Sequence, residues 1–197
     1  MEQEKINQIV ELGNSIIKKI ENKESKILFY VFDTKNKPLT SIKYTYDCVK
    51  YLVQLGYNAY IFHEKEYVGV KDWLGVEYSN LPHKTFEQKS LKVDSSDVIV
   101  IPEMAAPIMK MLGADAKIPC KKIVICQSYE FITELLIPGD SWFMYGFDEV
   151  IVTSKILGDY VKTLFPNIKY SVMPVGIDSE LFTEFKEPKK PNITILC

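Results

Sequence analysis

The chain has 197 residues and a formal net charge of −2, with 47% hydrophobic and 25% charged residues. This is the composition of an ordinary globular protein, long enough for one domain or for one domain and the beginning of a second. The near-neutral charge gives no indication of a general attraction to nucleic acid or to anionic lipid.

Targeting and metal-binding patterns are absent from the sequence. The acidic N-terminus lacks the continuous apolar core of a signal peptide, and no stretch approaches the roughly 20 apolar residues that span a bilayer. The four cysteines form no C-x-x-C pair and no metal-ligand spacing, which favours free thiols in a reducing compartment. We therefore expect a cytoplasmic protein with no transmembrane segment, no metal and no cofactor.

The predicted elements alternate along the chain. Isoleucines at helical spacing predict an amphipathic N-terminal helix over 3–21. Nearly uninterrupted apolar runs then predict strands buried on both faces of a parallel sheet, and amphipathic segments between them predict helices. The strands are expected at 26–33, 57–63, 97–103, 121–127, 148–154 and 170–176, and the helices at 41–56, 104–112, 128–136 and 155–165.

This alternation predicts an α/β fold, namely a Rossmann-like, doubly wound, mainly parallel sheet with helices on both faces. Ser41 is a possible N-cap of its helix, and Gly56 is a suitable residue to end it. Residues 64–96 form a polar and aromatic stretch without clear periodicity.

Ligands of such sheets bind beyond the carboxyl ends of the strands, so the residues that follow each strand are the candidates for a site. These residues come from six separate places in the sequence. The candidates that border a binding site are Asp33, Lys35, Thr40, Ser41, His63, Glu103, Gln127, Ser128, Ser154, Gly176 and Asp178.

Several of these residues also have structural interpretations. For His63 we favour a hydrogen-bonded structural role over a general base or a sugar contact. Glu103 could be a catalytic carboxylate, but we favour capping of the helix that begins near Met104. Ser128 is equally well explained as an N-cap, Ser154 repeats its arrangement, and Lys35 is more commonly a solvated loop charge than an anion ligand. Gly176 lies between two β-branched residues and is predicted to turn the chain with a positive φ.

Known catalytic motifs are missing. The loop after the first predicted strand, "DTKNKPLTS", contains no glycine, which argues against a dinucleotide-binding enzyme. The sequence has no P-loop, no zinc-protease motif, no nucleophile elbow and no EF-hand loop. It also lacks the alternation of aromatic and basic residues that is typical of single-stranded nucleic-acid binding.

One segment resembles a known family. "DEVIVTSKILGDYVKTLFP", followed by "YSVMPVGIDSELF", resembles the end of the N-terminal domain of GT-B glycosyltransferases, particularly the large retaining family four. The earlier "SIKYTYDCVKYLVQLGYNAYIF", "DVIVIPE" and "KKIVICQSY" resemble its first helix and its second and middle strands. The chain differs from that family in its first loop, which usually carries a glycine pair, and at Gln127, where many members have histidine.

The resemblance implies a two-domain enzyme that transfers a sugar from a nucleotide-sugar donor to a glycan or other hydroxyl acceptor without a metal. Residues 26–185 would form the acceptor-side domain after an N-terminal helix at 1–25, and residues 186–197 would form a linker and the first strand of a C-terminal donor-binding domain. The catalytic residues would lie in that C-terminal domain, so this chain alone is expected to show little or no transfer. The alternative is a non-catalytic Rossmann-like module that binds a glycan, a small anion or a protein partner.

Overall fold

The computed structural model describes residues 25–177, except for 36, 66–69, 71–72, 87–91, 111–117, 135, 137 and 148. The predicted N-terminal helix, the predicted linker and strand at 186–197, and Asp178 lie outside the described residues. Among the residues that are described, no helix is long and apolar enough to cross a membrane.

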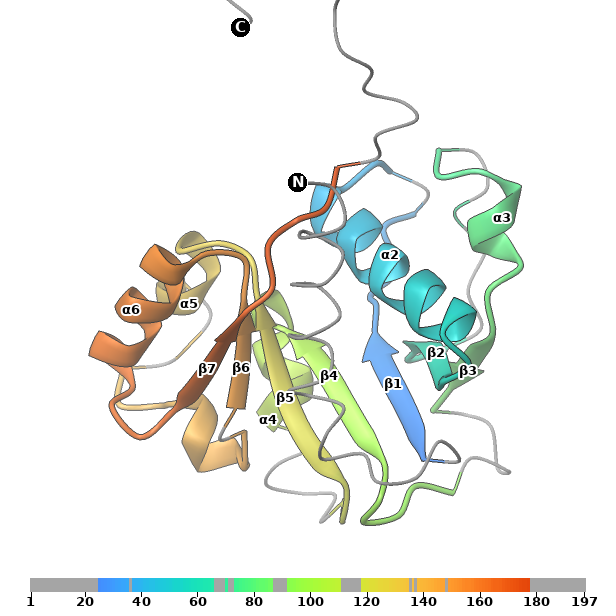
Figure 1. Ribbon diagram of the computed structural model, residues 1–197. Coiled ribbons are helices and arrows are strands. Elements are labelled where there is room, and N and C mark those ends of the chain that lie inside the picture. The colour runs from blue at the N-terminus through green and yellow to red at the C-terminus, as the bar shows by residue number, and fades with distance from the viewer. Residues whose placement is uncertain are drawn as a thin grey trace, which may run out of the picture.

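A seven-stranded sheet forms the centre of the fold (Figure 1). Its spatial order is β3-β2-β1-β4-β5-β6-β7, and every pair of neighbouring strands is parallel. The prediction of a parallel α/β sheet is therefore confirmed. The strands are β1 (Lys26–Tyr30), β2 (Asn58–His63), β3 (His83–Thr85), β4 (Val98–Pro102), β5 (Lys121–Cys126), β6 (Glu149–Val152) and β7 (Lys169–Val172).

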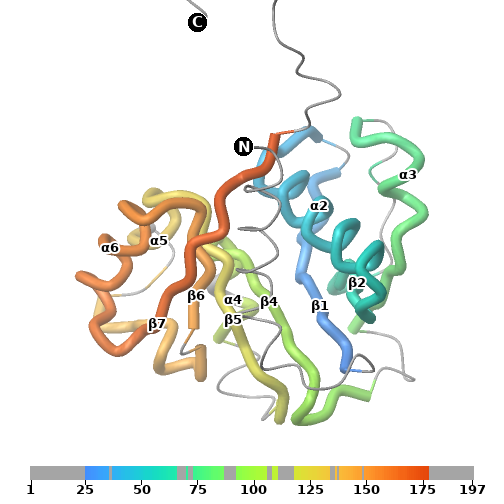
Figure 2. The backbone as a smooth tube through the Cα atoms, viewed as in Figure 1, coloured from blue at the N-terminus to red at the C-terminus, as the bar shows by residue number. Residues whose placement is uncertain are grey.

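The helices occupy the connections between these strands. The α-helices are α2 (Thr40–Gln54), α3 (Val76–Ser79), α4 (Ala106–Lys110), α5 (Glu130–Glu134) and α6 (Lys155–Leu164). Among the described residues, 3₁₀ turns lie at Glu103–Ala105 after β4 and at Trp142–Tyr145 before β6. The tube in Figure 2 shows how the chain passes repeatedly from sheet to helix and back.

Each face of the sheet has its own apolar core, because successive side chains of a strand point to opposite faces. On one face, Phe29 and Ile61 belong to the same core as Ile42 and Val49 of α2. On the other face, the core unites strand residues such as Leu28 with side chains of α4, α5, α6 and the 3₁₀ turn at Trp142–Tyr145. Covering of both faces explains why the strands are almost uninterrupted apolar runs.

Helix ends agree with the sequence at some positions and differ at others. Gly56 has a φ of 82° just past α2, as expected of a glycine that ends a helix. Ser41 does not cap α2, because the N-cap is Leu39 and Ser41 lies inside the first turn. The Leu39 carbonyl already accepts the N–H groups of Ile42 and Lys43, so the helix begins earlier than the sequence suggests.

The segment after β7 crosses to the first half of the fold. The hydroxyl of Tyr44, on α2, donates to the carbonyl of Met173 over 2.7 Å. In Figure 1 the orange-red chain leaving β7 passes upward to the blue loop between β1 and α2. The start of the chain beyond β7 is therefore held at the carboxyl ends of the strands, on the side of the β1–α2 loop.

Candidate functional site

The strand order of the sheet reverses between β1 and β4. From β1 the chain adds β2 and β3 on one side, and β4 and the later strands lie on the other side. Open parallel sheets bind ligands beyond the carboxyl ends of the strands at such a switch point. The residues that follow β1, β4 and β5 are therefore the first place to look for a site.

The loop after β1 folds back on itself without a glycine. A carboxylate oxygen of Asp33 accepts the backbone N–H of Lys35 over 2.7 Å, and the Lys37 N–H donates to the Thr34 carbonyl over 3.1 Å. Lys35 has a φ of 51°, a left-handed conformation that side chains other than glycine adopt at a cost. Asp33 and Lys35 are exposed, so the structure gives them a loop-forming geometry with side chains open to solvent.

Glu103 follows β4 directly and is buried, with 1% of its surface exposed. Its Oε1 accepts the backbone N–H groups of Gln127 and Ser128, each over 2.9 Å. Its Oε2 is also buried but has no hydrogen-bond partner among the described residues. The hydrogen bonds of this carboxylate go to the segment that follows β5, and not to the helix near Met104 that the favoured capping role would involve.

Two effects shift the pKa of Glu103 in opposite directions. Burial raises the pKa of this carboxyl, and hydrogen bonds from backbone N–H groups, including those of Gln127 and Ser128, lower it. The net direction is upward. A carboxyl in this position can therefore hold a proton more readily than an exposed one.

Gln127 connects this carboxylate to α2. Its side-chain amide donates to the Ser41 carbonyl over 3.3 Å, while its backbone N–H donates to Glu103. The Ser41 hydroxyl and the Thr34 hydroxyl are both buried without a partner among the described residues. We call Ser41, Glu103 and Gln127 the switch-point cluster, because Gln127 forms hydrogen bonds with both of the other residues.

Two buried oxygen atoms without a partner in one cluster, the Ser41 hydroxyl and Oε2 of Glu103, are unusual, because each buried polar atom without a partner costs about 1–3 kcal/mol. Hydroxyl groups can both donate and accept, and a carboxylate accepts. A ligand bearing several hydroxyl groups could satisfy both atoms. An anion would instead face the lone pairs of Glu103.

His63 lies apart from this cluster, on the β2 side of β1. It is buried, its Nδ1 lies 3.3 Å from the Val31 carbonyl, and its Nε2 lies 2.8 Å from Nδ1 of His83. These contacts agree with the hydrogen-bonded structural role that the sequence favoured.

The two serines lie at helix starts. The Ser128 hydroxyl accepts the N–H of Glu130, the first residue of α5, over 3.2 Å. The Ser154 hydroxyl accepts the Leu157 N–H over 3.2 Å and is the N-cap of α6. Thr40 is the exposed first residue of α2. The capping interpretation is supported for Ser154, whereas Ser128 bonds to the start of α5 from two residues before it.

The prediction for Gly176 is wrong. The glycines with positive φ in the described part of the chain are elsewhere, so Gly176 does not supply a left-handed turn. A Cβ added to Gly176 would meet nothing within 4 Å. The segment after β7 continues without the reversal that we expected, and Gly176→Ala should leave the stability nearly unchanged.

One feature of the site has no clear sequence signal. The contact between Glu103 and residues 127–128 depends on β4 and β5 being adjacent, which only the sheet order reveals. Within the described residues, no group of three or more histidine, cysteine, aspartate or glutamate side chains is arranged to hold a metal ion.

The sheet and the switch point define the class of this chain as a Rossmann-like parallel α/β protein. No protein-family model, no curated protein and no solved structure matches it.

Proposed function

We propose that this chain is the acceptor-side part of a GT-B-type glycosyltransferase, and that the switch-point cluster binds a hydroxyl-bearing acceptor. The observation that carries the proposal is that two residues joined through Gln127, Ser41 and Glu103, each have a buried side-chain oxygen without a partner among the described residues. Their chemistry fits the alternating donors and acceptors of a sugar or another polyol.

The same cluster disfavours the phosphates of a nucleotide sugar. The loop after β1 has no glycine to bring its backbone close to a pyrophosphate. The buried carboxyl of Glu103 would also repel an anion at this position whenever it is ionised. In the proposal, the donor is therefore bound by a second domain, as the resemblance to family four implies, and that domain supplies the catalytic groups.

Binding should be weak when only this part is present. Each neutral hydrogen bond contributes about 1 kcal/mol, so three or four of them give roughly millimolar affinity. Little or no sugar transfer is expected from this chain without the donor domain.

The test is a titration followed by ¹H–¹⁵N NMR. The probes are the methyl glycosides of glucose, galactose, mannose and N-acetylglucosamine, with UDP-glucose and GDP-mannose as the donor-type comparison. At least one glycoside should shift the amide signals of Ser41, Gln127 and Ser128. Ser41→Ala and Glu103→Gln should abolish these shifts, whereas Thr163→Ala on the exposed side of α6 should not.

Two results would contradict the proposal. Larger shifts of the same amides with the nucleotide sugars would show that the switch-point cluster binds the donor and not the acceptor. Unchanged spectra with every glycoside at tens of millimolar would show that the switch-point cluster does not bind an acceptor. Glycoside binding combined with no transfer in the presence of any donor domain would favour the non-catalytic binding module.

A further inference from the structure

Tyr129 and Tyr160 form an exposed aromatic pair, and Tyr129 lies two residues after Gln127 of the switch-point cluster. The rings of Tyr129 and Tyr160 lie 5.2 Å apart between centroids, at an interplanar angle of 71°. Their side chains remain exposed, with relative exposures of 46% and 37%. This is the edge-to-face arrangement that aromatic pairs favour.

The pair is not part of either apolar core. The residues of α6 that face the sheet are Leu157, Gly158 and Val161, and Tyr160 belongs to the opposite side of the helix with the exposed Ile156. Within the described residues, neither phenol hydroxyl has a hydrogen-bond partner. Packing therefore does not explain why two aromatic residues meet here.

The backbone around Tyr129 is fixed by several bonds. The Ser128 N–H donates to Glu103, the Ser128 carbonyl accepts the Cys126 thiol over 3.6 Å, and the Tyr129 carbonyl accepts the Ile132 N–H over 3.3 Å. Tyr129 is also only two residues from Gln127, which limits the separation of their Cα atoms to about 7 Å. The ring is thus presented from a rigid segment that belongs to the switch-point cluster.

We infer that Tyr129 and Tyr160 form a second saccharide subsite, which stacks on the apolar C–H face of the sugar next to the one held by the switch-point cluster. This inference rests on the proposed function and specifies the acceptor as at least a disaccharide. Tyrosine suits this role because its large ring loses little conformational entropy on binding and its hydroxyl can bond to sugar oxygens. The continuity with Gln127 and Ser128 is what favours a saccharide over a protein partner.

The experiment compares disaccharides with monosaccharides on matched variants. The probes are maltose, cellobiose, lactose and N,N′-diacetylchitobiose, each measured against the methyl glycoside of its reducing-end sugar by NMR titration. Tyr129→Ala and Tyr160→Ala should weaken disaccharide binding roughly two- to tenfold and leave monosaccharide binding unchanged. Phe143→Ala is the matched control, because Phe143 is an aromatic residue of similar exposure in the 3₁₀ turn before β6.

The outcomes separate this inference from the proposed function. If the glycosides bind at Ser41 and Gln127 but the tyrosine variants bind disaccharides normally, the subsite is wrong and the acceptor site stands. If disaccharides shift the tyrosine ring signals but Glu103→Gln has no effect, the pair binds sugar and the proposed acceptor site is wrong. If the tyrosine variants change the sedimentation coefficient instead of sugar affinity, the pair is a protein interface and the inference fails. Failure of every saccharide to bind overturns both.

Discussion

The imidazole rings of His63 and His83 stack on each other, with 5.0 Å between centroids and an interplanar angle of 12°, and Nε2 of His63 lies 2.8 Å from Nδ1 of His83. The Val31 carbonyl beside Nδ1 of His63 requires a proton on that nitrogen, so Nε2 of His63 accepts. His83 then donates from its own Nδ1. The pair is built for two neutral rings.

Acid should therefore destabilise this protein before its carboxylates are protonated. Burial, together with the neighbouring His83, lowers the pKa of His63 to about 4, and burial also lowers the pKa of His83. A nearby carboxylate, Asp33, opposes the effect on His63 only weakly. Because the unfolded chain binds protons near pH 6.5 and the folded chain does not, the free energy of unfolding falls as the pH drops from about 6.5 towards 4. His63 alone accounts for a loss of about 3 kcal/mol, and His83 adds to it in the same direction.

Urea denaturation at intervals between pH 8 and pH 4.5 measures this slope. The variant His63→Gln with His83→Gln lacks both rings and should lose most of it. An identical slope in the double variant would show that the histidine pair does not control acid stability.

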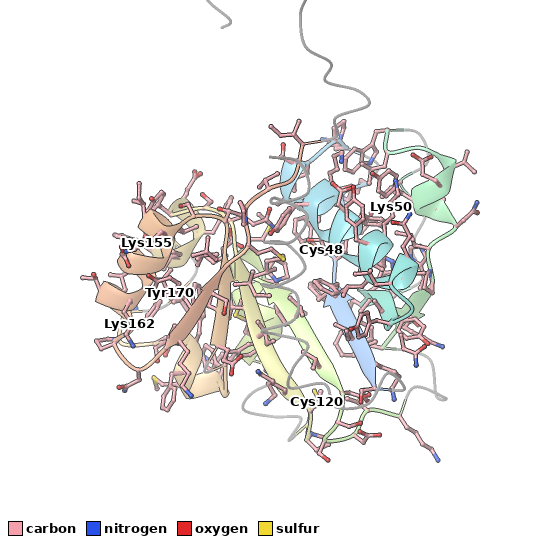
Figure 3. The ribbon with its side chains drawn as sticks, viewed as in Figure 1. Cys48, Lys50, Cys120, Lys155, Lys162 and Tyr170 are labelled. Atoms are coloured by element: carbon pink, nitrogen blue, oxygen red, sulfur yellow. The ribbon has the colours of Figure 1, made fainter. Side chains whose placement is uncertain are left out.

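Gly158→Ala should destabilise the protein, although alanine is the better helix former. A Cβ at this position would lie 2.4 Å from the ring of Tyr170, which also donates to Asp159 over 2.5 Å. In Figure 3 Tyr170 and Lys155 are both labelled in the region of α6 and β7. We expect a loss of about 1–3 kcal/mol from this overpacking, against a gain of about 1 kcal/mol from helix propensity.

Thermal or urea unfolding measures this effect, and the matched background is Tyr170→Ala. There the added methyl group has room, so Gly158→Ala should be neutral or stabilising. Equal losses in both backgrounds would mean that Tyr170 is not the obstacle.

Asp97 should be far more important for stability than the exposed ion pairs. Its buried carboxylate accepts the Lys26 N–H over 2.7 Å and the Asp94 N–H over 2.9 Å, and it pairs with the Lys26 ammonium over 2.9 Å. Asp97→Ala leaves these donors unpaired and should cost about 3–5 kcal/mol. Lys43→Ala, which breaks the surface pair with Asp47, should cost at most about 0.5 kcal/mol. Urea midpoints that differ little between the two variants would contradict this ranking.

Replacing Lys35 by asparagine or glycine should stabilise the β1–α2 loop. The φ of 51° is costly for lysine, whereas asparagine and glycine tolerate it, so a gain of roughly 0.5–1 kcal/mol is expected. Lys37→Gly is the control, because Lys37 has no positive φ and the added flexibility of its unfolded chain should lower stability. If both glycine variants lose stability equally in urea unfolding, Lys35 is not strained.

Gln127→Ala should affect ligand binding more than stability. Its side chain makes one long hydrogen bond, to the Ser41 carbonyl at 3.3 Å, so unfolding measurements should show a loss of about 1 kcal/mol or less. Loss of a ligand hydrogen bond should weaken glycoside binding, and lower the activity of a complete enzyme, roughly three- to tenfold. A large fall in melting temperature with normal binding by the folded fraction would make Gln127 a structural residue.

The long buried elements could be predicted from the sequence, because burial on both faces leaves a continuous apolar run. The strand β5, with four fully buried residues from Ile123 to Cys126, is an example. The edge strand β3 could not be predicted in the same way, since its three residues are all half-buried and carry no periodic signal. Neither could the one-turn helix α3, which lies in the same polar stretch.

The candidate site was predictable as a location but not as a set of contacts. The rule that ligands meet strand ends placed Ser41, Glu103 and Gln127 among the candidates. Their connection depends on hydrogen bonds between segments that are distant in sequence, such as Glu103 to Gln127. Left-handed residues were misjudged at two positions: Gly176 lacks the positive φ that was predicted for it, and Lys35 has one that no glycine signals.

The hydrogen bond from Tyr44 to Met173 joins residues that are 129 positions apart. It connects α2 with the segment that follows the last strand of the sheet. No strand pairing depends on it, because β7 ends at Val172. Met173 is also bonded to β6, because its N–H donates to the Val152 carbonyl over 2.7 Å. A fluctuation that breaks the Tyr44 bond can therefore release the chain beyond Met173 from α2 while the sheet stays intact. Such local opening requires much less free energy than unfolding, and hydrogen exchange would report it as early loss of protection next to a fully protected core.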